Sequence, residues 1–131
     1  MAVFTDLEID YLGSQHLARL ATASKSGQPD VSAVGFGVDG DTIVSGGLDL
    51  TKTVRYRHLN ENPRATIVID DVTSVNPWSP RGVKVRGHAV IEEEAGSLRI
   101  RIHPEVVWSW GINPDAEKRF ASIERRTVPK G

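Results

Sequence analysis

Short strand-like segments separated by tight turns are the feature that most limits how this chain can fold. Asp39-Gly40-Asp41 lies between two such segments, and its glycine accepts the positive φ that a hairpin turn needs. Only one helix-like segment, residues 51–62, stands between strands, which disfavours a parallel doubly wound sheet. The pattern predicts a mainly β fold, a small barrel of six to seven antiparallel strands with two short helices. The expected strands are residues 17–23, 30–38, 42–45, 65–69, 83–91, 98–102 and 105–111, where the last either stands alone or continues the one before it.

The strand ranges 17–23, 30–38 and 42–45 are joined by short turns, so we expect them to form a three-stranded meander. Residues 70–82, which hold two prolines and a tryptophan, are expected to form a loop. Residues 113–131 are more polar than the rest and are expected to be a loosely docked tail.

Two helices are expected. Thr5 and Glu8 have the spacing of a capping box, which predicts a helix over residues 5–13. Thr51 can cap a second helix, which Pro63 prevents from continuing.

The composition narrows the class of protein. A chain of 131 residues fits one domain, residues 1–131, with enough length for a hydrophobic core. Sixteen basic and 17 acidic residues give a net charge of −1, which disfavours a general nucleic-acid binder. Residues 1–10 lack the basic start of a secretory signal, and the longest aliphatic run is too short to cross a membrane. We therefore expect a soluble, cytoplasmic protein that binds neither nucleic acid nor membranes.

Conventional catalytic groups are not recognisable in the sequence. There is no cysteine, which excludes disulfides, thiolate nucleophiles and cysteine-containing metal sites. The four histidines (His16, His58, His88 and His103) lack the spacing of metal ligands, and we expect them to be structural or on the surface. We predict no catalytic side chain and no metal site, so that a bound cofactor would supply the chemistry of any enzyme activity.

The basic segment that begins at residue 51 is the strongest candidate for a binding site. Lys52 and Arg55 are one helical turn apart and would face the same way in the first turn of the expected helix. Free backbone N–H groups and the helix dipole favour an anion there. The alternative is a solvated basic face that binds nothing.

Three tryptophans add less specific signals. Trp78 stands between two prolines and could pack in the core, meet a partner or stack on a planar ligand. Trp108 and Trp110 share one face of a strand, which is typical of an interface or of a barrel lid.

The order of these segments resembles a known family. Residues 17–23, the turn Gly27-Gln28-Pro29, the run Val31-Ser32-Ala33-Val34, the segment from Lys52 to Pro63-Arg64-Ala65 and the strand Ile67-Val68-Ile69-Asp70 carry the likeness. The chain looks like the pyridoxamine 5′-phosphate oxidase-like (PPOX class) split β-barrels, an FMN-binding-like fold, in the actinobacterial branch that uses the deazaflavin F420. The resemblance covers about residues 5–112, and residues 76–82 and 108–112 look like one subgroup of that branch.

The resemblance implies a homodimer with the cofactor at the subunit interface. It places the polar edge of the cofactor ring on the backbone of the second expected strand, and the phosphate on the basic segment. Either Lys52 or Arg55 could be the main phosphate contact, since the segment from Lys52 to Pro63 is longer than in some relatives. Members of this family often have a longer segment between the last two strands, and in this chain only residues 95–97 stand in its place. The cofactor-binding residues expected on this basis are Asp30, Val31, Ser32, Ala33, Val34, Lys52, Arg55, Arg57 and Trp78.

The resemblance implies an F420-dependent oxidoreductase that transfers a hydride to an unsaturated small molecule, such as an enone, a quinone or a tetrapyrrole. One alternative is an FMN-dependent oxidoreductase on the same fold. Another is a flavin or deazaflavin carrier without turnover. A barrel that binds single-stranded nucleic acid is disfavoured by the acidic balance.

Overall fold

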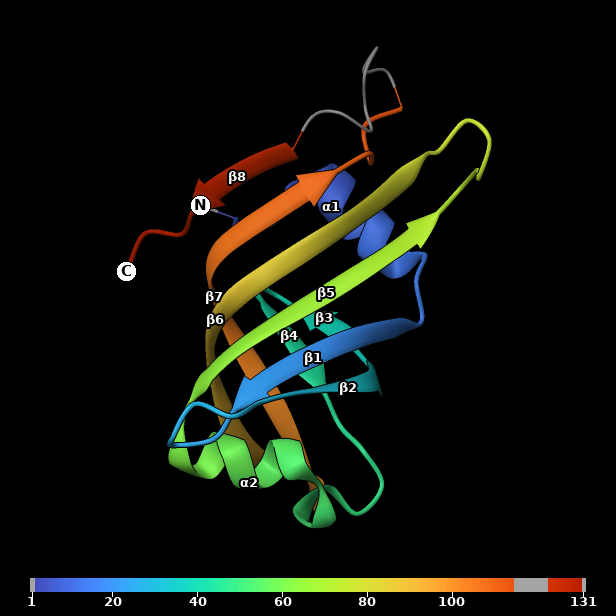
Figure 1. Cartoon of the computed structure of the whole chain (residues 1–131). Coiled ribbons are helices and arrows are strands. Elements are labelled where there is room, and N and C mark those ends of the chain that lie inside the picture. The colour runs from blue at the N-terminus through green and yellow to red at the C-terminus, as the bar shows by residue number, and fades with distance from the viewer. Residues whose placement is uncertain (1, 115–122, 131) are drawn as a thin grey trace.

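The chain forms a curled antiparallel sheet with one helix near each end of it (Figure 1). The computed structural model describes residues 2–114 and 123–130. Its elements in chain order are α1 (Asp6–Gly13), β1 (Leu17–Ala23), β2 (Pro29–Gly35), β3 (Gly37–Asp39), β4 (Thr42–Ser45), the 3₁₀ turn η1 (Leu50–Lys52), α2 (Val54–Glu61), β5 (Arg64–Val72), β6 (Pro80–Glu94), β7 (Ser97–Trp110) and β8 (Ile123–Thr127). The strand order is β2-β1-β5-β6-β7-β4-β3, and β8 pairs with β7. The predicted mainly β barrel with two short helices is confirmed, with eight strands among the described residues where six to seven were expected.

Alternation along the strands builds the core. Leu20, Ile67, Val85 and Val107 lie side by side across β1, β5, β6 and β7, and all four side chains are fully buried. The residues next to each of them in sequence point to the outer face of the sheet. Each buried aliphatic side chain of this size contributes roughly 1.5–3 kcal/mol of transfer free energy. This row of side chains therefore fixes the register of the central strands.

The first helix begins as the capping box predicts. The Thr5 hydroxyl accepts from the Glu8 backbone N–H at 3.1 Å, and the Glu8 carboxylate accepts from the Thr5 N–H at 3.0 Å. Both helices are eight residues long. In the part of the chain that the structure describes, no helix is long and apolar enough to cross a membrane.

The expected strand over residues 30–38 is wrong, because the chain bends at Phe36. Residues before this point form β2 at one edge of the sheet, and residues after it form β3 at the other edge. The predicted three-stranded meander is therefore also wrong. Phe36 packs against the core, and the glycines on either side of it leave the backbone free to bend. The Ser45 hydroxyl donates to the carbonyl of Gly35 at 2.8 Å and holds the crossing in place.

The second helix begins two residues later than expected. Thr53, not Thr51, is the N-cap, and its hydroxyl accepts from the backbone N–H of Tyr56 at 3.2 Å. The same hydroxyl donates to the carbonyl of Leu50 at 2.6 Å, which ties the helix to the preceding 3₁₀ turn. Lys52 therefore lies in that turn, outside the helix.

The last strands are longer than expected. The loop between β5 and β6 spans only residues 73–79, because the ladder of these strands continues beyond residue 69 as far as Val72 opposite Pro80. The two ranges 98–102 and 105–111 belong to one continuous strand, β7, so the alternative in which the last range continues the one before it is confirmed. The register of β6 and β7 shifts at Gly87, where a Cβ atom would collide with the carbonyl of His103.

The C-terminal residues are in part an element of the sheet. Residues 123–127 form β8 and pair with the end of β7, so the expected loose docking is wrong for this stretch. Arg126 donates from Nη1 to the Glu8 carboxylate at 2.9 Å, and Nη2 also contacts that carboxylate and the carbonyl of Val3. Glu8 is only 1% exposed, so this ion pair joins the last strand to the first helix. The rest of the expected tail, residues 115–122 and 131, lies outside the described residues.

Candidate functional site

The second strand lies at an edge of the sheet. Among the described strands, β2 pairs only with β1, so its other side carries backbone N–H and C=O groups that no strand satisfies. Val31 is 65% exposed and Ala33 is also exposed, whereas Asp30 and Ser32 are half-buried. The side chain of Val34 is buried in the core. The strand can thus offer backbone groups and two small apolar side chains to a ligand beside it.

The basic segment has a different geometry from the one expected. Lys52 and Arg57 line one hollow of about 330 Å³, and Arg55 does not reach it. Arg55 and Arg57 are two residues apart in α2, so their side chains leave the helix in directions about 160° apart. The expectation that Lys52 and Arg55 share the first helical turn is therefore wrong. The structure instead brings Lys52 together with Arg57.

Arg55 reaches toward the loop that contains Gly46 and Gly47. A Cβ atom on Gly47 would lie 2.6 Å from Nη2 of Arg55, so the missing side chain makes room for the guanidinium. The Nε of Arg55 is buried and has no hydrogen-bond partner among the described residues. A buried donor left unpaired costs about 1–3 kcal/mol. An anionic group bound at this point would remove that cost, so the residues present fit a phosphate.

Trp78 lies outside the core. It is 58% exposed on the loop over residues 73–79, so the core-packing alternative is wrong. The loop is closed at its base, where the backbone N–H of Thr73 donates to the Ser79 carbonyl at 3.0 Å. The N–H of Ser79 donates in turn to the Ser74 carbonyl at 2.9 Å. The indole is therefore held on an anchored loop, and its role against a planar ligand stays a prediction.

The described residues contain no group of three side chains that could hold a metal ion. His58 is buried, and its Nδ1 lies 3.0 Å from the hydroxyl of Thr22. His88 and His103 stack with ring centroids 4.9 Å apart on neighbouring strands. These contacts suit histidines that stabilise the sheet.

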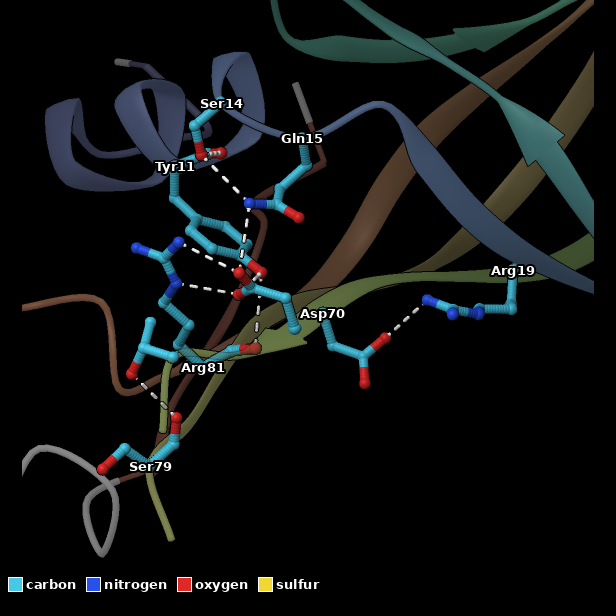
Figure 2. Close-up of polar contacts among 9 residues, drawn as sticks. Tyr11, Ser14, Gln15, Arg19, Asp70, Ser79 and Arg81 are labelled. Atoms are coloured by element: carbon cyan, nitrogen blue, oxygen red, sulfur yellow. Dashed lines mark hydrogen bonds and ion pairs between the residues drawn. The ribbon is translucent and has the colours of Figure 1, made fainter. Parts of the chain in front are cut away.

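A partly buried cluster formed by Tyr11, Asp71 and Arg81 joins α1 to the β5–β6 hairpin (Figure 2). Arg81 donates two hydrogen bonds to the Asp71 carboxylate, at 2.8 and 3.0 Å, and the Tyr11 hydroxyl donates a third at 2.8 Å. The bonds from Arg81 hold the pKa of Asp71 below its usual range. Burial raises the pKa of Tyr11, and its bond to Asp71 adds to this effect. The carboxylate is thus ionised and already bonded to its donors, which suits a structural role and not that of a general base.

Sequence reasoning missed this cluster, because Asp71 and Arg81 fell in the expected loop and no local spacing links them to Tyr11. Figure 2 also shows the neighbouring Asp70 facing away from the cluster, where it pairs with Arg19 at 2.9 Å.

The sequence of the chain matches that of known proteins over most of its length. The profile described as pyridoxamine 5′-phosphate oxidase matches residues 7–111. A protein of Streptomyces rimosus, named 5a,11a-dehydrotetracycline/5a,11a-dehydrooxytetracycline reductase, is 35% identical over 122 residues, which cover 86% of each chain. The chain belongs to the pyridoxamine 5′-phosphate oxidase family. The resemblance seen in the sequence is therefore confirmed at the level of the family.

Solved structures of low sequence identity share the fold of this family member. A heme-binding protein of Mycobacterium smegmatis superposes with a TM-score of 0.72 at 18% identity, over 95% of this chain, which spans 59% of that protein. An FAD-binding protein of Mesorhizobium loti gives a TM-score of 0.63 at 18% identity, over 81% of this chain and 93% of the other. These likenesses concern the fold alone.

Proposed function

We propose that this protein is an F420 (deazaflavin)-dependent oxidoreductase that acts as a homodimer. The observation that carries the proposal is the 35% identity with a reductase over 86% of both chains. The acceptor we propose is a carbon–carbon or quinone double bond in an unsaturated small molecule, because the Streptomyces relative is named as a reductase of dehydrotetracyclines.

Three basic side chains would attract the anionic groups of the cofactor. Arg55 has a buried Nε without a partner, which makes it our candidate for the main contact. Lys52 and Arg57 face a separate hollow, so we assign them to a second anionic group or to steering of the cofactor. FMN also carries a phosphate, so these residues alone do not separate the two cofactors.

The ring would lie beside β2. The free backbone edge over residues 30–34 offers donors and acceptors to the polar edge of a flavin or deazaflavin. The loop that carries Trp78 follows β5 at the other end of the sheet from α2 (Figure 1), so its indole would meet this ring only from the second copy of the chain. A reduced deazaflavin bound there supplies a hydride. The residues of this chain bind and orient the ring and hold its phosphate, and we assign no side chain to acid or base catalysis.

A second copy of the chain would cover the outer face of β1 and β2. Leu17 is 58% exposed and Val31 is 65% exposed, and both lie on this face. Exposed apolar side chains on one face of a sheet are typical of an interface. The homodimer would place a second surface over the edge of β2 and exclude water from the ring.

Equilibrium dialysis of the protein against F420 and against FMN tests this proposal. We expect tighter binding of F420, and a loss of about tenfold or more in affinity for Arg55→Leu, since a charge-assisted contact is removed. Lys25→Gln is the matched control, because Lys25 is an exposed cation on the β1–β2 turn. A parent protein that binds neither cofactor contradicts the proposal. Preferential FMN binding would favour the FMN alternative, and F420 binding without turnover would favour a carrier.

A further inference from the structure

A hollow on the outer face of β1, β5 and β6 contains none of the residues assigned to the cofactor above. It measures about 370 Å³, which lies within the range of about 300–1,000 Å³ that small-molecule sites occupy. In Figure 1 it belongs to the part of the sheet where β1 ends and β5 begins, near α2.

Short side chains form the floor of this hollow. Ala21 on β1 lies beside Thr66 on β5, and both residues are next in sequence to fully buried core residues, so their side chains point outward. Ala23 lies two residues further along β1 and also lines the hollow. The floor therefore has room for a small aliphatic group and one hydroxyl that can bond to it.

Two arginines line the hollow without a carboxylate partner. Arg86 is the neighbour of Thr66 on β6, and Arg64 lies two residues before Thr66 on β5. Both are exposed, and in the described part of the chain neither has a carboxylate within ion-pair distance. Arg86 does contact a ring, that of Trp108, at 5.1 Å, but this leaves its charge unbalanced. The arginines that do have such a partner are Arg19, Arg81, Arg99, Arg101 and Arg126.

One carboxylate lines the same hollow. Glu105 is the extra residue where the register of β6 and β7 shifts, so no residue of β6 lies opposite it. Its side chain is 54% exposed, and its carboxylate lies 3.9 Å from Nδ1 of His88, which is too far for a hydrogen bond. It forms no ion pair with Arg64 or Arg86. The hollow thus holds groups of both signs that are not in contact with each other.

We propose that this hollow binds a small zwitterion of the α-amino-acid type. The carboxylate of the ligand would lie against Arg64 and Arg86, and its ammonium group against Glu105. Its aliphatic side chain would lie on the two alanines of the floor. A carboxylic acid without the amine would meet the charge of Glu105 with nothing to balance it, so the site would prefer the zwitterion. Binding of this ligand rests neither on the cofactor nor on the activity proposed above.

L-Leucine is a suitable probe, titrated into the ¹⁵N-labelled protein and followed by the backbone amide signals of Thr66 and Gly87. We expect these signals to shift in a saturable way, less strongly as salt rises. Two analogues separate the charges: 4-methylpentanoate lacks the ammonium group, and 3-methylbutylamine lacks the carboxylate. Each should bind at least about fivefold more weakly than leucine, because one charged contact is lost in a site exposed to water.

Substitutions of the charged residues test the same assignment. Arg86→Gln should lower the affinity for leucine by about fivefold. Arg99→Gln is the matched control, because Arg99 is already paired with Glu94 at 3.0 Å and does not line the hollow, so leucine should bind this variant as it binds the parent. Glu105→Gln should weaken the binding of leucine and strengthen that of 4-methylpentanoate. A role of Glu105 in folding alone would not produce these opposite changes.

The proposal is overturned if leucine shifts no signals of the parent, or if Arg86→Gln, folded by circular dichroism, binds leucine as the parent does. It is also overturned if 4-methylpentanoate binds the parent as tightly as leucine, or if Glu105→Gln strengthens the binding of both, since the site would then select anions only. A second copy that covers the hollow would likewise overturn it: the parent would sediment as a dimer and bind no leucine. Dialysis of the parent against F420 tests the proposed function separately, because the two sites share no residue.

Discussion

Replacing Asp71 by Asn tests whether the cluster in Figure 2 holds the first helix on the sheet. The substitution keeps the shape of the side chain and removes its charge. The carboxylate accepts two hydrogen bonds from Arg81 and one from Tyr11, all between 2.8 and 3.0 Å. Charge-assisted hydrogen bonds are worth about 1.5–3 kcal/mol each when well shielded.

The expected loss is smaller than the sum of these bonds. The side chains of Arg81 and Asp71 are 33% and 31% exposed, so water screens part of their attraction. We expect Asp71→Asn to lower the free energy of unfolding by about 2 kcal/mol. For a chain of this size, that corresponds to a fall in Tm of roughly 6–8 °C. Thermal unfolding followed by circular dichroism at pH 7 measures it.

Asp70→Asn is the matched control, because Asp70 is the next residue and is also in an ion pair. Its partner is Arg19, but both side chains are about half exposed. Such a surface pair contributes about 0–1 kcal/mol, so its removal should change Tm by no more than a few degrees. Equal losses in the two variants would mean that the hydrogen bonds of Asp71 do not hold the first helix on the sheet.

The same cluster predicts a dependence on pH. Hydrogen bonds from Arg81 lower the pKa of Asp71 in the folded protein, so its contribution is present above the unfolded pKa of about 3.9. The contribution is lost as the pH falls through the folded pKa. The difference in stability between the parent and Asp71→Asn should therefore shrink below about pH 4. A difference that stays constant down to pH 2 would contradict the assignment.

Two further substitutions test other parts of the structure. Arg126→Gln should lower the free energy of unfolding by about 2–3 kcal/mol in a urea titration, because the buried carboxylate of Glu8 loses its charged partner and keeps only the N–H of Thr5. An unchanged midpoint would contradict the role of this pair. Gly47→Ala should weaken F420 binding in dialysis by about tenfold, because the new Cβ would displace the guanidinium of Arg55. Gly46→Ala is the control: a Cβ atom there would meet open space, so this variant should bind F420 as the parent does. Equal affinity in both glycine variants would mean that Arg55 does not hold the phosphate.

Local patterns predicted most of the elements of this fold. The capping box at Thr5 and Glu8 involves residues three apart, and the structure forms it as expected. The strands that alternate clearly, such as β1 and β5, begin or end within a few residues of the expected positions. Such signals depend on near neighbours in the chain, so one sequence is enough to read them.

The errors lie where distant contacts decide. The break at Phe36 depends on the core that its ring joins and on the pairing of β4 with β7. The last strand was missed because residues 123–127 are mostly charged and do not alternate, and because their partner is the edge of β7. No local spacing indicates either pairing.

The sequence shows the basic residues of the proposed phosphate site but does not show how they are arranged. Thr51 and Thr53 both have the side chain of an N-cap, and the sequence does not choose between them. A start at Thr53 leaves Lys52 in the preceding turn, beside Arg57, and leaves Arg55 facing Gly47. The buried Nε of Arg55 is visible only once that packing is known.

The proposed activity of this protein is the reduction of an unsaturated molecule by a reduced deazaflavin. The most direct measurement mixes the protein with reduced F420 and then with menadione, a cyclic enone or a dehydrotetracycline, and follows the absorption of the oxidised cofactor. We expect one acceptor molecule to be reduced for each F420 oxidised, faster than without protein, and Arg55→Leu to slow the reaction at low cofactor concentration. If F420 binds tightly and none of these acceptors oxidises it faster with protein than without, the claim is contradicted.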